Sequence, residues 1–96
     1  MLFRSVSATS SFDRVVKKLH GKDKKIVDIE VAAVAENPSM GEEKKGDLLG
    51  VFVHKFKLNK QETLLAYELV PSKLKPKTVV LLALGPHENF YTALKR

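Results

Sequence analysis

The sequence predicts an α+β fold in which an αα-hairpin packs on a small, mostly antiparallel sheet, in the element order β, α, α, β, β, β, α. The first observation is a change of period: apolar residues recur at about 3.6 residues in the first half of the chain and at about 2 residues from position 51 onward. The second is length, because 96 residues supply the apolar surface of one hydrophobic core. We therefore expect a single domain over residues 1–96.

The first half predicts one strand and two helices. Residues 2–8 alternate loosely and lead into the hydroxyl-rich segment 9–11, which is typical of a helix N-cap. From there, apolar side chains follow the i, i+3, i+4, i+7 spacing of an amphipathic helix, at Phe12, Val15, Val16 and Leu19. Gly21 ends this helix, and a second helix from about Asp23 is expected to stop before Pro38. Residues 39–50 are expected to form a surface loop.

The second half predicts three strands and a terminal helix. Residues 51–58 and 63–70 alternate as strands, joined by a hairpin connection at 59–62. Residues 78–84 form a nearly continuous apolar run, which indicates a central strand covered on both faces and ended by the Gly-Pro that follows. Residues 88–95 suit a short helix. The two earlier helices should cover one face of this sheet and leave the opposite face open.

Charge and composition narrow the classes of function. The net charge is +6, with nine basic against eight acidic residues in positions 1–48 and eight against three in positions 49–96. A basic half is compatible with a nucleic acid, an anionic membrane or an acidic protein. There is no cysteine, so disulfides and thiolate metal sites are excluded, and the cytoplasm is the expected compartment. We expect neither a signal peptide nor a membrane span.

Alternation on the strand 51–58 singles out two lysines. Phe52 and Phe56 fall on the face expected under the helices, whereas Lys55 and Lys57 fall on the open face about 6.6 Å apart, a spacing that can engage neighbouring phosphates. Exposed strands often carry two lysines at this spacing, so a merely solvated face is an equally simple interpretation.

A second candidate group follows the strand 78–84. In a helix from His87, Tyr91 is four residues on, so an imidazole and a phenol would share one face. The alternative is a helix-start residue and a half-buried anchor. His20 and His54 are expected to be structural, and no metal-binding, phosphate-loop or nucleophile motif is present, so no cofactor is predicted.

These features together resemble the RelE/ParE superfamily of bacterial toxins over essentially the full length. The resemblance is carried by the helix pair ending in residues 36–38, by the segments 54–58 and 64–67, and by residues 84–91. In the RelE branch such proteins are endoribonucleases that cut mRNA in the ribosomal A site and are neutralised by a cognate antitoxin. The resemblance thus implies mRNA, the ribosome and an antitoxin as partners.

The resemblance also implies roles for individual residues. Lys55 and Lys57 match the basic pair that holds the scissile phosphate, and His87 matches the residue that protonates the leaving group. Tyr91 matches a terminal aromatic residue that either accepts a proton as a general base or stacks on a nucleobase of the RNA. Lys60 and Tyr67 are expected to contact RNA. The implied reaction needs no metal: the 2′-hydroxyl attacks the adjacent phosphate and leaves a cyclic phosphate and a free 5′-hydroxyl.

Two alternatives remain open. The stretch 63–68 lacks the arginine that the family's third strand carries, which favours the ParE branch, whose members inhibit DNA gyrase and cut no RNA. A catalytically inactive RNA-binding homologue is the other alternative.

Overall fold

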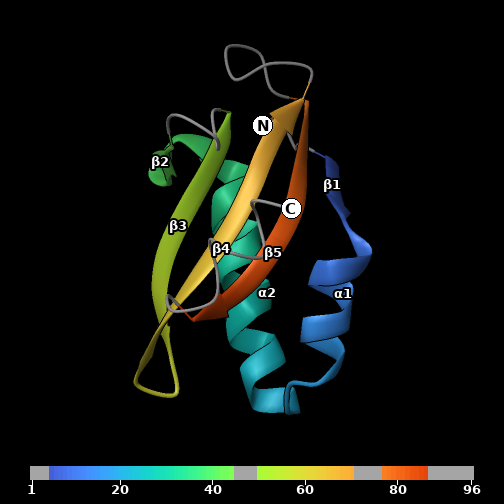
Figure 1. The fold of residues 1–96 in the computed structure, drawn as a ribbon, viewed down its shortest axis with the longest axis vertical. Helices are drawn as coiled ribbons and strands as arrows, with labels where there is room; N and C mark the ends of the chain where they lie inside the picture. Colours follow the sequence, from blue (N-terminus) through green and yellow to red (C-terminus); the bar gives the residue numbers. More distant parts are fainter. Residues whose placement is uncertain (1–4, 45–49, 71–76, 87–96) are drawn as a thin grey trace.

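The computed structural model describes residues 5–44, 50–70 and 77–86, and it shows the α+β fold that the sequence predicts (Figure 1). Helices α1 (Ser10–Lys17) and α2 (Gly21–Glu36) form a hairpin on one face of a five-stranded sheet. The strands are β1 (Ser5–Ala8), β2 (Glu42–Glu43), β3 (Val51–Leu58), β4 (Gln61–Val70) and β5 (Thr78–Pro86), and a short 3-10 turn, η1 (Pro38–Met40), follows α2. The expected terminal helix at 88–95 lies outside the described residues. Among the described residues, no helix is long and apolar enough to cross a membrane.

The sheet is mostly antiparallel, as predicted: in the order β1-β5-β4-β3-β2, three strand pairs are antiparallel and β1 runs parallel to β5. It differs from the expected sheet in two details. The segment expected to be a loop contains β2, whose two residues are too few to show an alternating pattern. Strand β5 also continues through the Gly-Pro that was expected to end it, because Pro86 still pairs with Thr63 at the end of the ladder.

Thr9 ties the start of α1 to an irregularity in β5. Ala66 pairs with Ala83 but Tyr67 pairs with Leu81, so Leu82 is an extra residue, as in a β-bulge. The Thr9 N–H donates to the Leu81 carbonyl at 3.0 Å, and its hydroxyl donates to the Leu82 carbonyl at 2.9 Å. The same hydroxyl accepts a hydrogen bond from the first turn of α1, which confirms the predicted N-cap.

Apolar side chains are buried on both faces of the sheet. The larger cluster lies between helices and sheet and includes Phe12, Val27, Val34, Phe52, Phe56, Tyr67, Val79 and Leu81. A smaller one, at Val53, Leu64 and Ala66, lies on the opposite face, which was expected to be open. The strand buried on both faces is β4 rather than β5, because β4 is the middle strand of the five.

Tyr67 fixes the segment that follows α2. Its side chain is fully buried and stacks on Phe52 with ring centroids 5.6 Å apart. Its hydroxyl donates to the Pro38 carbonyl and accepts from the Gly41 N–H at 3.0 Å. A Cβ at position 41 would overlap this hydroxyl, so the close approach requires glycine there.

We predict that Tyr67→Phe lowers the free energy of unfolding by about 1–3 kcal/mol, because the buried Pro38 carbonyl and the partly buried Gly41 N–H lose their partner. Burial also raises the pKa of the Tyr67 phenol. Its contribution to stability is therefore complete below the ordinary value of about 10 and declines as the pH rises above it. Urea unfolding at pH 7 and at alkaline pH should show a smaller alkaline loss for Tyr67→Phe than for the wild type. Equal losses in the two proteins would contradict this role.

Candidate nucleic-acid interface

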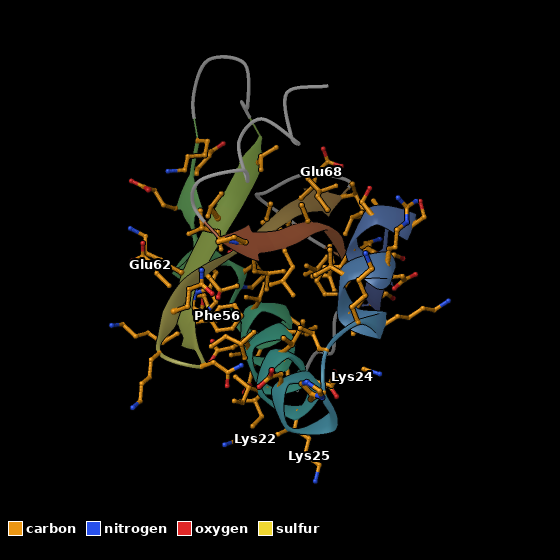
Figure 2. All side chains as sticks on the ribbon, turned by 60° about the horizontal axis from the view of Figure 1, so that its bottom comes forward. Lys22, Lys24, Lys25, Phe56, Glu62 and Glu68 are labelled. Atoms are coloured by element: carbon orange, nitrogen blue, oxygen red, sulfur yellow. The ribbon has the colours of Figure 1, made fainter. Side chains whose placement is uncertain are left out.

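Lys55 and Lys57 lie on β3 with their side chains exposed on the sheet face opposite the helices. Their neighbours in the strand, Phe56 and Leu58, are buried in the cluster under the helices. Phe56 is labelled in Figure 2, where its ring points toward α2. The alternation of a single strand thus separates a core-facing row from a row that carries two exposed lysines.

The connection between β3 and β4 is tighter than the expected span of 59–62. Only Asn59 and Lys60 lie outside the ladder, and both have positive φ, 54° and 67°, as in a type I′ hairpin turn. Asn59 donates a 2.8 Å hydrogen bond from its side-chain amide to the carboxylate of Asp23 in the first turn of α2. This contact joins the hairpin turn to the helix pair and leaves Lys60 exposed beside it.

Each lysine of the pair has a carboxylate nearby. Lys57 lies directly opposite Glu62 across the ladder. Glu42, on β2, has its pKa lowered first by a 2.9 Å hydrogen bond from Lys44 and by the charge of Lys44, and further by the charge of Lys55. The two glutamates therefore weaken the positive potential that the lysines present to a phosphate.

Sequence reasoning missed both carboxylates. Glu42 falls in the segment expected to be a loop, and no local sequence pattern predicts that this segment pairs with β3. Glu62 was predictable in principle, since a two-residue turn at 59–60 places position 62 opposite position 57.

The other candidate residues have different positions. Lys60 is exposed in the turn, whereas Tyr67 is fully buried on the helix face with its hydroxyl occupied, which argues against the expected RNA contact. We therefore leave Tyr67 out of the interface. His87 and Tyr91 lie outside the described residues.

The two remaining histidines have no place in the interface. His54 faces the helices, and its Nε2 lies 2.6 Å from a carboxylate oxygen of Glu30 on α2. His20 is the exposed N-cap residue of α2 and makes no side-chain cap bond. Within the described parts of the chain, no group of three potential metal ligands occurs.

Comparison with known proteins identifies the class of fold. The chain matches the RelBE2 toxin–antitoxin complex of Mycobacterium tuberculosis with a TM-score of 0.71 and 21% identity over 90% of this chain and 100% of that one. A mutant RelE toxin from E. coli in the free state matches with a TM-score of 0.71 and 15% identity over 98% and 94% of the two chains. The intact RelBE complex of E. coli matches with a TM-score of 0.67 and 16% identity over 88% of this chain and 98% of that one. No curated protein matches the sequence.

The arrangement of two helices on a mixed five-stranded sheet is thus the fold of these RelE toxins. The sequence is more specific. Residues 6–95 match the family described as ParE-like toxin of type II bacterial toxin-antitoxin system. The chain belongs to this family.

We predict that Glu62→Gln raises the affinity of the protein for unstructured RNA by about two- to fivefold at low salt, because it removes the charge opposite Lys57. The matched control is Glu68→Gln on the same strand, about 20 Å from Glu62 and near the opposite end of β4 (Figure 2). Fluorescence anisotropy with a labelled oligonucleotide measures both. An equal gain in the two variants would mean that only net charge matters and that Lys57 holds no phosphate.

Proposed function

We propose that this toxin is a metal-independent endoribonuclease that cleaves mRNA on the ribosome and so inhibits translation. The observation that carries the proposal is the pair of exposed ammonium groups on one face of β3, at alternate positions of a RelE-like sheet. Two cations at this spacing suit a phosphodiester whose charge increases as the 2′-hydroxyl attacks it.

The proposed roles follow from that chemistry. Lys55 and Lys57 hold the scissile phosphate and stabilise the phosphorane, and Lys60 contacts the backbone of the same strand. His87 protonates the departing 5′-oxygen, for which an imidazole with an ordinary pKa of about 6.5 is suited, and Tyr91 acts as the base or as a stacking platform. The roles of His87 and Tyr91 rest on their sequence positions alone.

An antitoxin is the proposed protein partner. Two of the similar structures are complexes of a toxin with its antitoxin, from M. tuberculosis and E. coli. Membership of a type II toxin–antitoxin family supports the same partner for this chain.

A gyrase-binding toxin without nuclease activity is the second candidate. Two observations favour it: Glu42 and Glu62 lie beside the lysines, and β4 carries no arginine over residues 63–68. Both reduce the positive charge available to a phosphorane. The two candidates differ in which cellular process stops first.

We predict that expression of the toxin without an antitoxin stops incorporation of labelled amino acids before it affects incorporation of labelled thymidine. The reason is that mRNA cleavage removes the template of translation directly. Pulse labelling within minutes of induction measures the order. Loss of thymidine incorporation first, with protein synthesis intact, would support the gyrase-binding candidate instead.

A further inference from the structure

The end of the helix pair carries the densest positive charge in the described part of the chain. We call it the hairpin tip, and it consists of Lys17, Lys18, Lys22, Lys24 and Lys25. The first two lie at the end of α1 and the other three in the first turns of α2. Figure 2 shows Lys22, Lys24 and Lys25 projecting outward from this end of α2. Four of the five are exposed and Lys24 is partly exposed.

Little acidic charge offsets the tip. Between residues 17 and 25 the only acidic residue is Asp23, which is buried, 6% exposed, and accepts the hydrogen bond from Asn59. None of the five lysines takes part in an ion pair with another described residue. The nearest exposed carboxylate along α2 is Asp28, three residues beyond the tip. Asp13 on α1 is likewise exposed, four residues before Lys17. The five lysines therefore outnumber the carboxylates around them and leave the tip with a net positive charge.

The surroundings of the tip favour a polyanion over a protein or a membrane. Lysine is depleted at the centres of protein interfaces, which usually contain apolar anchors. Between residues 17 and 25 no large apolar side chain is exposed, and Ile29 is the nearest one along α2. A membrane-binding helix needs a free apolar face, but that of α1 packs on the core through Phe12, Val15 and Val16.

The same surroundings favour a duplex over a single strand. Proteins that bind single strands without sequence preference stack bases on exposed aromatic side chains. All four aromatic residues in the described part of the chain, Phe12, Phe52, Phe56 and Tyr67, are buried. A duplex hides its bases and presents phosphates, which lysines can contact without any aromatic platform.

We propose that the hairpin tip binds the phosphate backbone of a double-stranded nucleic acid. That this nucleic acid is RNA rather than DNA rests on the proposed function. In that case the tip holds structured RNA next to the single strand that Lys55 and Lys57 engage. The 2.8 Å bond between Asn59 and Asp23 joins the two surfaces, with Lys60 exposed between them. An enzyme with two such surfaces works best where a flexible strand lies beside a duplex, as it does in the ribosome.

The test measures how binding of an RNA duplex of about 16 base pairs depends on salt. The main variant is Lys22→Gln/Lys24→Gln/Lys25→Gln, and Lys17→Gln/Lys18→Gln provides a second one on the other helix. Each lost phosphate contact should flatten the slope of log affinity against log salt by about 0.9. Two variants that each remove one charge are compared: Lys25→Gln in the tip and, as its control, Lys77→Gln. Lys77 is exposed and lies beside Val70, at the end of β4 that is far from the tip. Circular dichroism verifies folding of every variant.

We expect a flatter slope for the tip variants and for Lys25→Gln, and the wild-type slope for Lys77→Gln. Equal losses for Lys25→Gln and Lys77→Gln, or wild-type slopes in both tip variants, would overturn the proposal. So would tip-dependent binding to anionic vesicles but not to the duplex. A DNA duplex of equal length identifies the source of the phosphates: tip-dependent binding of RNA supports structured RNA, and binding of DNA alone contradicts it.

Failure of the proposed function has a different signature. If Lys55→Ala/Lys57→Ala binds an unstructured RNA as the wild type does, the site on β3 is wrong, whatever the duplex slopes show. If that variant binds less RNA while both tip variants keep their duplex slopes, the tip proposal alone fails.

Discussion

The two-residue turn at Asn59 and Lys60 fixes the register of β3 against β4. Positive φ at both positions gives the turn the twist that a tight hairpin needs, and asparagine tolerates this conformation better than most residues. Because side chains alternate along a strand, a slip of one residue in β3 would turn Lys55 and Lys57 into the core and expose Phe56. The register therefore determines which groups the protein offers to a phosphate.

Two polar contacts hold α2 to the sheet, a third holds the segment that follows it, and together they carry this register into the rest of the fold. Asp23 in the first turn accepts from Asn59, Glu30 in the middle contacts His54, and the residues after the helix bind the Tyr67 hydroxyl. Such contacts are directional, whereas the apolar packing around them is not. They set where the hairpin tip lies relative to the lysines of β3.

The sequence predicted the parts of the fold that depend on local pattern. The hydroxyl cluster at 9–11 indicated an N-cap, which the structure places at Thr9, and alternation located β3 with its bounds and its two faces. The parallel pairing of β1 with β5 and the extra residue at Leu82 depend on contacts between distant segments, which no local period encodes. Two-residue β2 is too short to have a period at all. The expected RNA contact of Tyr67 was misjudged because its hydroxyl is held by distant residues, in η1 and at Gly41, which the local pattern does not reveal.

The most direct test of nuclease activity at the β3 lysines maps the ends of cellular mRNA shortly after induction of the toxin. The wild type and Lys77→Ala should produce new ends inside translated regions, with 5′-hydroxyl groups on the downstream fragments. Lys55→Ala/Lys57→Ala, shown to be folded and equally abundant, should produce few or none. Growth arrest by the wild type without new mRNA ends would contradict the account, as would undiminished cleavage by the double variant.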